Sequence, residues 1–576
     1  MICLKQLREL FPLTWCEITI LAVGIITFNF PAYGKIRGDF NGDGFSDLAI
    51  GVPFEDITVR TRTITDAGAV NVLYGSSRGL QATSPDDQFW HQNSPDVRNV
   101  SEAEDCFGWA LSTGDFNGDG YDDLAIGVPL EDITIGTVTI TNAGAVNVLY
   151  GSSRGLQATS PDDQFWHQSR ADVQNVSETE DRFGWVLSTG DFNGDGYDDL
   201  AIGIPFEDGA GAVQVLYGSS RGLQATTPDD QFWHQDSPGV KETKEIQDNF
   251  GRYLSAGDFN GDGYDDLAIG VPDEDVTIGT TTAINAGTVQ VLYGSLNGLQ
   301  ANGVGGPDDQ LWQQGHSGVQ DTPEGGDYFG SNLSVGDFDG DGYDDLAIGV
   351  YREEIIAGTN NAGAVQVLYG SLNGLQADGV NGPDDQLWQQ GGDVLDKAEE
   401  KDNFGLPLAS GDFNNDGYDD LAIGVPDEDL AEDEIDHLNN NDEGAIAVLY
   451  GSPDGLQADG VNGPDDQFWH QNSPGVRNFS ETKDYFGSSL GAGDFNGDGS
   501  DDLAIGIFKE DVGAGRLFDA GAVAVLYGSS TAGLQASAPD DQLWSQNSPG
   551  VRDTAEDVDN FGMALPETHE DGNLPQ

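Results

Sequence analysis

The sequence predicts an all-β fold, a seven-bladed β-propeller with four-stranded antiparallel blades. Three phrases recur in the same order seven times along the 576 residues. The first is a variant of G-D-F-N-G-D-G-Y-D-D-L-A-I-G, the second ends in L-Y-G-S, and the third is D-D-Q followed by F-W or L-W. No helical pattern separates them, and seven units lie within the usual range of about four to eight blades.

The repeat extends over nearly the whole chain after residue 34. The first Asp of the first phrase stands at positions 39, 115, 191, 258, 337, 412 and 494, so that one unit takes 67 to 82 residues. No proline-rich or charged linker separates the units. Because a closed array of repeats forms one large domain, we expect residues 35–576 to be a single propeller.

The second unit illustrates the four strands that each unit is expected to form. Asp123–Val128 alternates large and small side chains with the period of two that is typical of a strand, and Ala145–Tyr150 is rich in strand-forming residues. We expect a first strand at Phe107–Ser112, before the Asp-rich phrase, and a fourth at Gln164–His167. The Trp of the third phrase, present in all seven units, is expected to pack between units.

The two ends of the repeat region complement each other. A Phe-Gly pair opens six units, but only residues 35–38 precede Asp39 in the first unit. An additional Phe561-Gly562 stands near the end of the chain. We expect this C-terminal segment to supply the missing strand of the first blade, which removes two exposed sheet edges. A truncated eighth unit is the less economical alternative.

The Asp-rich phrase is the candidate metal site. Its first, third, fifth and ninth residues offer carboxylate or amide oxygens, and the seventh can offer a backbone carbonyl. Ca²⁺ takes about six to eight oxygen ligands, which one tight turn of this pattern supplies, whereas Mg²⁺ fits such a loop less well. The flanking strands and the lack of a Glu at position twelve exclude an EF-hand. The alternative is an Asx-turn without metal, which three mutually repelling carboxylates disfavour.

The loops 39–47, 115–123, 191–199, 258–266, 337–345, 412–420 and 494–502 therefore predict up to seven Ca²⁺ ions, one per blade. The fifth loop has four carboxylates where the others have three, and we expect it to bind Ca²⁺ most tightly. The predicted ligands are Asp39, Asn41, Asp43 and Asp47; Asp115, Asn117, Asp119 and Asp123; Asp191, Asn193, Asp195 and Asp199; Asp258, Asn260, Asp262 and Asp266; Asp337, Asp339, Asp341 and Asp345; Asp412, Asn414, Asp416 and Asp420; and Asp494, Asn496, Asp498 and Asp502.

Together, the Phe-Gly pairs, the Asp-rich loops and the L-A-I-G-V-P phrases resemble FG-GAP repeats, as found in the N-terminal seven-bladed propeller of integrin α subunits. The resemblance implies calcium loops on one face of the propeller and partner-binding loops on the other. Two departures stand out. All seven units carry the loop here, whereas integrin chains use it in only some blades, and we expect no counterpart of the integrin leg domains and transmembrane helix.

The composition limits the kinds of partner. The chain has 23 basic and 100 acidic residues and a formal net charge of −77, which repels nucleic acid and anionic lipid. Lys5 and Arg8, the apolar stretch Ile18–Phe30 and small residues before Lys35 are typical of a signal peptide over residues 1–34. The alternative for that segment is an uncleaved membrane anchor. In either case we expect the propeller to lie outside the cell, secreted or at its surface.

The leading functional hypothesis is a monomeric recognition or adhesion module, with calcium mainly structural and an extracellular protein or glycan as partner. The connections between the second and third strands vary most and are the expected contact surface: Glu55–Asp66 is long, Glu207–Gly211 short and Glu428–Glu443 acidic. A structural surface-layer or matrix component is the alternative. An extracellular hydrolase or lyase is less favoured, because no cluster of catalytic residue types departs from the repeat, and we expect the chain not to be an enzyme.

Overall fold

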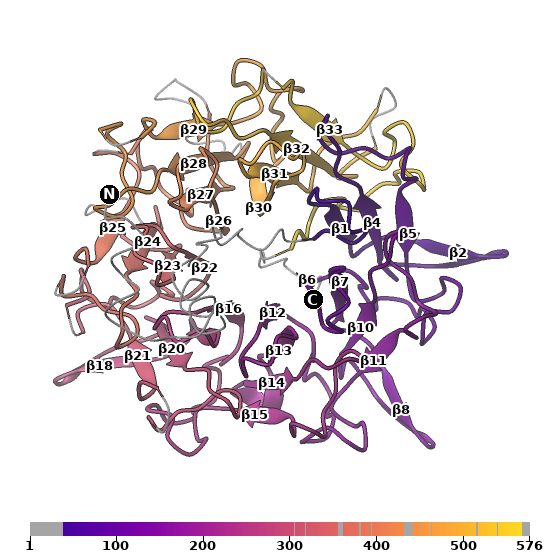
Figure 1. Ribbon diagram of the computed structural model, residues 1–576, viewed down its shortest axis with the longest axis horizontal. Coiled ribbons are helices and arrows are strands. Elements are labelled where there is room, and N and C mark those ends of the chain that lie inside the picture. The colour runs from indigo at the N-terminus through magenta and orange to yellow at the C-terminus, as the bar shows by residue number, and fades with distance from the viewer. Residues whose placement is uncertain are drawn as a thin grey trace, which may run out of the picture. The chain divides into compact units, whose positions relative to one another are not determined.

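Seven antiparallel sheets follow one another around a ring in the computed structural model of the chain (Figure 1). The structure describes residues 38–566 apart from 304–305, 317, 355–360, 380–381, 393, 431–441, 462, 514–516 and 538. These residues belong to one compact unit, Arg37–Gln576. The predicted seven-bladed all-β propeller is confirmed, and the only helix among the described residues is the short 3₁₀ turn η2 (Glu207–Gly209).

The blades hold the following strands. The first has β1 (Leu48–Val52), β4 (Ala69–Leu73) and β5 (Gln88–Trp90); the second β6 (Leu111–Gly114), β7 (Asp123–Val128), β10 (Ala145–Leu149) and β11 (Gln164–Trp166). The third has β12 (Leu187–Gly190), β13 (Asp199–Ile204), β14 (Ala212–Leu216) and β15 (Gln231–Trp233); the fourth β16 (Tyr253–Gly257), β17 (Asp266–Val271), β20 (Thr288–Leu292) and β21 (Gln310–Trp312). The fifth has β22 (Leu333–Gly336), β23 (Asp345–Val350), β24 (Ala364–Leu368) and β25 (Gln386–Trp388). The sixth has β26 (Leu408–Gly411), β27 (Asp420–Val425), β28 (Ala445–Leu449) and β29 (Gln467–Trp469); the seventh β30 (Phe486–Gly493), β31 (Asp502–Ile507), β32 (Ala522–Leu526) and β33 (Gln542–Trp544).

The second strand of each blade is buried on both faces, because neighbouring sheets pack directly against each other. Every residue of β7 is buried, and it pairs in register with β10 from Leu124–Leu149 to Val128–Ala145. A Cβ atom at Gly127 would lie 2.3 Å from the carbonyl oxygen of Gly184 in the next blade. The small-residue face that the sequence predicts is therefore required for the close approach of the sheets.

The first strand of a typical blade begins later than the sequence suggests. We expected it at Phe107–Ser112, whereas β6 spans Leu111–Gly114. Gly108 has a φ of 92°, which is incompatible with a regular strand. Phe107 is instead fully buried and forms a parallel bridge to Gly68 of the preceding blade. The Phe-Gly pair therefore ties two blades together before the strand begins.

Hydrogen bonds between the last and first blades close the ring. Ser46 N–H donates to the Asp494 carbonyl oxygen at 3.0 Å, and Gln542 Nε2 donates to the Leu80 carbonyl oxygen at 3.1 Å. The same two bonds join successive blades elsewhere, for example Gln88 Nε2 to the Leu156 carbonyl oxygen at 2.9 Å.

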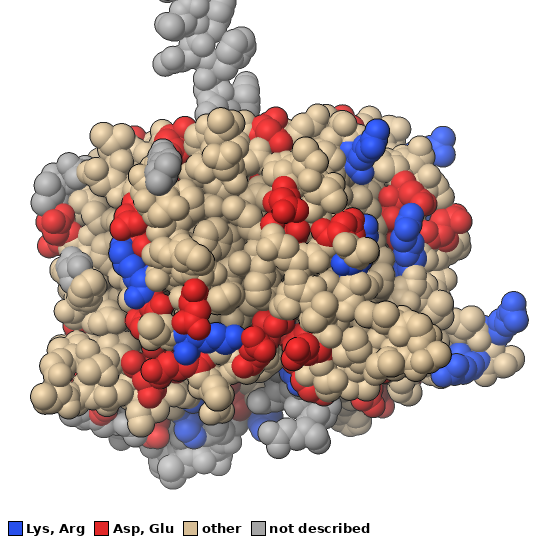
Figure 2. All heavy atoms as spheres, turned by 90° about the horizontal axis from the view of Figure 1, so that it is seen from below, with Lys and Arg blue, Asp and Glu red and all other residues tan. Residues whose placement is uncertain are grey.

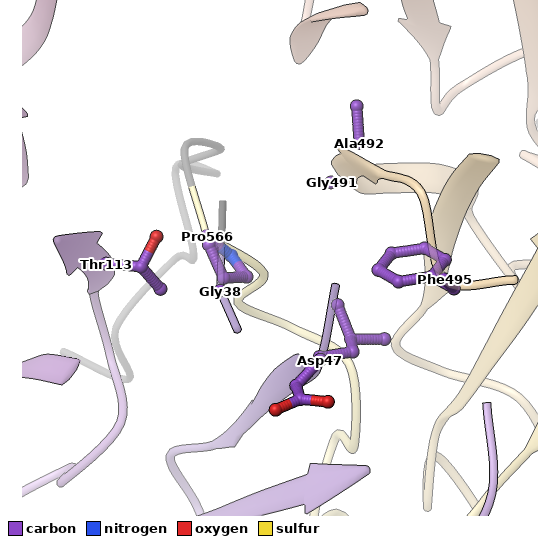
Figure 3. A pocket seen from close by; sticks show the side chains of 8 residues that line it. Gly38, Asp47, Thr113, Gly491, Ala492, Phe495 and Pro566 are labelled. Atoms are coloured by element: carbon purple, nitrogen blue, oxygen red, sulfur yellow. The ribbon is translucent and has the colours of Figure 1, made fainter. Parts of the chain in front are cut away.

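The C-terminal segment reaches the edge of the first blade but is not assigned as a strand. Gly51 N–H donates to the Ala564 carbonyl oxygen at 2.8 Å, and Gly562 N–H donates to that of Gly51 at 3.1 Å. The bridge between Gly51 and Ala564 is isolated, so the first sheet has three described strands, and its completion by a C-terminal strand stays a prediction. A small cavity lined by Asp47, Thr113, Phe495, Pro566 and neighbouring residues lies beside this edge (Figure 3).

Within the described residues, three blades carry an additional two-stranded hairpin between their second and third strands. These are β2 (Ile57–Val59) with β3 (Arg62–Ile64), β8 (Ile133–Ile135) with β9 (Val138–Ile140), and β18 (Val276–Ile278) with β19 (Thr281–Ala283). Figure 1 shows them projecting outward from the ring. Among the described residues no helix is long and apolar enough to cross a membrane. The signal peptide expected at residues 1–34 lies outside the described residues.

Candidate metal sites

The Asp-rich loops connect the first and second strands of the blades and therefore lie at one face of the ring. Within each loop the first Asp fixes the turn. In the first loop Asp39 accepts hydrogen bonds from the backbone N–H groups of Asp43 at 3.0 Å and Gly44 at 2.8 Å. Gly42 and Gly44 take φ values of 70° and 87°, which glycine adopts without strain. The loop conformation is thus held by its own sequence.

The ninth residue is the most buried carboxylate of each loop. Asp47 is 3% exposed and its six counterparts are fully buried. Its two oxygens accept from the backbone N–H of Gly75 at 2.9 Å and of Phe40 at 3.0 Å. Burial raises the pKa of this carboxyl well above its ordinary value in all seven loops, and the bond from the glycine opposes that shift. A negative charge at this position is therefore costly unless a cation accompanies it.

The fifth loop gathers its carboxylates most closely. Oxygens of Asp337, Asp339 and Asp345 lie within 4.8 Å of one another, and no other Asp-rich loop of the described chain brings three carboxylates so near. Burial, with repulsion from Asp341 as a further cause, raises the pKa values of Asp337 and Asp339 to about 6. The donor set, carboxylates converging on one turn, fits a hard divalent cation.

In the other six loops an Asn stands at the third position and changes the local electrostatics. Asn117 Nδ2, for example, lies 3.1–3.2 Å from the two carboxylate oxygens of Asp123 and donates to them. That contact leaves the amide Oδ1 for a ligand and reduces the repulsion that we expected among three converging carboxylates. The predicted ligands of every loop are described and lie together in their own loop, but the electrostatic argument against an Asx-turn holds most firmly for the fifth loop.

The Asp that precedes the ninth residue has a role that sequence reasoning missed. Asp122 Oδ2 accepts from the backbone N–H groups of Gly38 and Asp39 in the preceding blade, both at 2.9 Å. The same bond to the first Asp of the preceding loop is made by Asp198, Asp265, Asp344, Asp419 and Asp501, at 2.7–3.1 Å. The doubled Asp in the repeat was the available signal. Adjacent loops are therefore linked by these hydrogen bonds. The first blade is the exception, because Ser46 stands at the eighth position of its loop.

The seventh residue of each loop packs on the preceding loop. A Cβ atom at Gly42 would lie 2.6 Å from the ring of Tyr121, and the equivalent glycines of five further loops face an aromatic ring at 2.4–2.7 Å. The sixth loop differs, because Asn415 replaces the glycine with a φ of 54°. Its neighbour at the seventh position is Ser500, which leaves room for the Asn side chain. These two exceptions occur together at one blade boundary.

The FG-GAP repeat family matches seven segments of the chain, at residues 38–73, 107–149, 183–216, 250–292, 329–368, 404–449 and 486–526. Each segment contains one Asp-rich loop and the second and third strands of its blade. The chain is an FG-GAP repeat protein. The resemblance that its motifs predict is thereby confirmed.

Known relatives of this FG-GAP repeat protein include integrin α subunits. Integrin alpha-PS2 of Drosophila melanogaster is 30% identical over 43% of this chain and 16% of its own length. Integrin alpha-5 of Xenopus laevis is 32% identical over 42% of this chain and 20% of its own. Phosphatidylinositol-glycan-specific phospholipase D of Bos taurus is 32% identical over 38% of this chain and 25% of its own. The matches thus span a quarter or less of these relatives.

Among solved structures, rhamnogalacturonan lyase PL11 of Bacillus licheniformis aligns over 76% of this chain and 78% of its own, with 11% identity and a TM-score of 0.31. A likeness this low does not bear on function.

Proposed function

We propose that this FG-GAP repeat protein is an extracellular recognition or adhesion module whose scaffold is stabilised by calcium. The observation that carries the proposal is that one face of the ring is constant and the other is variable. One face holds seven near-identical Asp-rich loops that are linked to one another, and the opposite ends of the same strands hold connections that differ from blade to blade. Binding is commonly placed in variable loops on a constant scaffold.

The Asp-rich loops would hold one Ca²⁺ each, mainly as a structural ion. Bound calcium would neutralise the buried ninth-position carboxylate and the first-position Asp, whose oxygens already fix the turn. Since the first Asp of one loop is bonded to the eighth-position Asp of the next, stabilising one loop also supports its neighbour. The proposal is that calcium stiffens this face of the ring rather than forming the partner's contact.

The three outward hairpins are the best candidates for contact with a partner. Each is anchored at its base by buried side chains, such as Ile57 and Ile64, and exposes apolar residues further out, including Val138 at 62% and Ile278 at 49%. The β2–β3 hairpin also carries exposed Arg60 and Arg62 and lies at the right of Figure 1. Figure 2 shows a projection with basic side chains on that side, in contrast to the acidic composition of the chain. Rigid, amphipathic hairpins of this kind suit a protein or glycan surface.

The extracellular location is supported by the relatives and by the sequence of residues 1–34. Integrin α subunits, which the FG-GAP segments resemble, are cell-surface proteins, and the N-terminal segment has the pattern of an export signal. We propose secretion or display at the cell surface for this chain.

An enzymatic function is the second candidate, because one relative is named as a phospholipase D. The match to that relative covers 25% of its length. A purely structural matrix or surface-layer component is the third candidate. The experiment below separates all three.

The experiment is a binding screen of the purified chain against glycan arrays and cell-surface protein extracts, in calcium and in chelator. The chain itself offers a short connection that can replace a hairpin. Glu55 and Gly68 are joined by a backbone hydrogen bond, as Glu207 and Gly211 are in the third blade. Replacing residues 55–68 by residues 207–211 therefore removes the β2–β3 hairpin while keeping a connection that the fold already uses.

We expect calcium-dependent binding of a protein or glycan that the hairpin replacement, in the first, second or fourth blade, weakens. Binding that survives removal of all three hairpins would contradict the proposed surface. Turnover of a phospholipid or polysaccharide would establish an enzyme instead, and ordered self-assembly without a partner would favour the matrix component.

A further inference from the structure

A second set of acidic groups lies at the boundaries between blades, at the strand ends opposite the Asp-rich loops. At each boundary a buried Glu that follows the second strand of one blade accepts a hydrogen bond from a buried Gln that follows the fourth strand of the preceding blade. The bonds are 2.5–2.8 Å long, and the pairs are Gln92–Glu131, Gln168–Glu207, Gln235–Glu274, Gln314–Glu353, Gln390–Glu428, Gln471–Glu510 and Gln546–Glu55. The Asp-rich loops do not account for these pairs.

The Gln of each pair has an unused acceptor. Its Nε2 donates to the Glu, but its Oε1 is buried and has no hydrogen-bond partner at any of the seven boundaries. These Gln residues are at most 2% exposed. A buried amide oxygen without a donor costs free energy, and the same atom is left without one at every boundary. A proton donor or a cation would satisfy it.

Acidic residues of the connection between blades complete the cluster. Oxygens of Asp321, Glu324 and Glu353 lie within 4.8 Å of one another, as do those of Asp396, Glu399 and Glu428. Glu353 is 1% exposed and Glu428 2%, whereas the Asp of each set faces solvent, which leaves an entry path for an ion. Among the described boundaries only these two gather three carboxylates so closely.

Three of the five other boundaries avoid this accumulation of charge, whereas Glu242 and Asp553 stand at the same position in the remaining two. The position of Asp321 and Asp396 is taken by an Asn in three boundaries, namely Asn99, Asn175 and Asn478. Asn175 Nδ2 donates to Glu207 Oε1 at 2.7 Å and thereby satisfies the buried carboxylate. An Asp at this position cannot donate when it is ionised and adds a negative charge instead. The boundaries at Asp321 and Asp396 therefore lack the compensation that the Asn-bearing ones have.

Nearby basic side chains compensate little of this charge. Lys397 Nζ lies 3.3 Å from Glu399 Oε1, but its side chain is 79% exposed, and an ion pair in that setting is weak. At the Asp321 boundary the described salt bridges include none of Asp321, Glu324 and Glu353. Three carboxylates and an amide oxygen are a donor set for a hard cation.

We propose that the blade boundaries at Asp321 and Asp396 are two divalent-cation sites, separate from the Asp-rich loops, that bind Ca²⁺ between adjacent blades. At the first, Asp321, Glu324 and Glu353 supply carboxylate oxygens and Gln314 supplies Oε1. At the second, Asp396, Glu399, Glu428 and Gln390 do the same. The ion joins a connection of one blade to the second strand of the next, so these sites tie the fourth, fifth and sixth blades to one another.

The test compares calcium stoichiometry, by equilibrium dialysis of the full-length protein against Ca²⁺ alone, between the wild type and a D321N/D396N variant. The variant copies the residue found at three other boundaries and keeps all seven Asp-rich loops. We expect it to bind two fewer ions. Asn175→Asp, the converse change at an Asn-bearing boundary, is expected to bind one more.

Melting in chelator provides the second measurement. If a cation is needed, D321N/D396N should melt at a higher temperature than the wild type without calcium, because each new amide can donate to the buried Glu. In calcium, this difference in melting temperature should become smaller or change sign. Equal stoichiometry of the wild type and the variant would overturn the proposal, and so would a lower melting temperature of the variant in chelator. Both chains keep all seven Asp-rich loops, so calcium bound in the loops contributes equally to the wild type and the variant. The difference between them therefore tests the boundary sites separately from the loops.

Discussion

The paired exceptions Asn415 and Ser500 allow a sharp test of how the blades pack. Substituting Ser500→Tyr restores the aromatic residue common to most loops but places it against Asn415 rather than a glycine. At five of the equivalent positions a tyrosine ring would lie 2.5–2.7 Å from a Cβ atom, closer than the 3.0 Å that real Cβ contacts keep. Overpacking of this kind costs about 1–3 kcal/mol of the free energy of unfolding. Asn415→Gly alone should change that free energy by about 0.5 kcal/mol or less.

The assay is a double-mutant cycle measured by denaturant unfolding in calcium. S500Y should be destabilised by about 1–3 kcal/mol, and N415G/S500Y should recover that loss, giving a coupling free energy of similar size. Ser500→Ala serves as the control, because it removes the hydroxyl without adding volume. A neutral S500Y, or a double variant as unstable as S500Y, would refute the packing argument.

Two further predictions concern polar groups. Asp122→Ala should lower the free energy of unfolding by about 1–3 kcal/mol, because two backbone N–H groups lose their acceptor. Ser46→Ala, at the equivalent position of the first blade, should have little effect. Equal effects of the two substitutions in denaturant unfolding would contradict the hydrogen-bonded link between loops. Burial raises the pKa of Glu131 to about 7 and that of Asp105 to about 8. Because the folded chain then holds protons that the unfolded chain releases, stability should fall as the pH rises from about 4 through 8. Melting temperatures measured over that pH range check this, and Glu131→Gln is expected to make the decrease of stability with pH less steep. A wild-type stability that stays constant or rises with pH, or a variant with the same pH dependence as the wild type, would contradict the prediction.

The repeat made most of the fold predictable. Because β7 lies between two neighbouring sheets, its alternation of large and small residues had to be kept in every blade, and its bounds, Asp123–Val128, are those that the sequence predicts. The first strand begins later than the sequence predicts, since a Phe-Gly pair resembles the start of a strand, whereas its glycine takes a positive φ and its Phe bridges to the preceding blade. Local patterns do not show which partner a buried side chain has.

The same limit applies to the candidate sites. Ligand spacing within one loop is local, so the four positions of each Asp-rich loop could be named from the sequence. The role of Asp122 depends on a residue 83 positions away, and the pair Gln92–Glu131 joins residues 39 positions apart. Such contacts arise only when two blades meet. The acidic phrase around Asp321 was visible in the sequence but could not be distinguished there from a solvated loop.

The central claim is that calcium in the Asp-rich loops stabilises the propeller. Differential scanning calorimetry of the wild type in excess Ca²⁺ and in chelator tests it most directly. An ion that binds only the folded chain stabilises it by about 2.7 kcal/mol per site at a concentration a hundred times its Kd. We therefore predict a large drop in Tm on chelation, reduced when Asp337, Asp339 and Asp345 are replaced by Asn. A Tm that is the same in calcium and in chelator would contradict the claim.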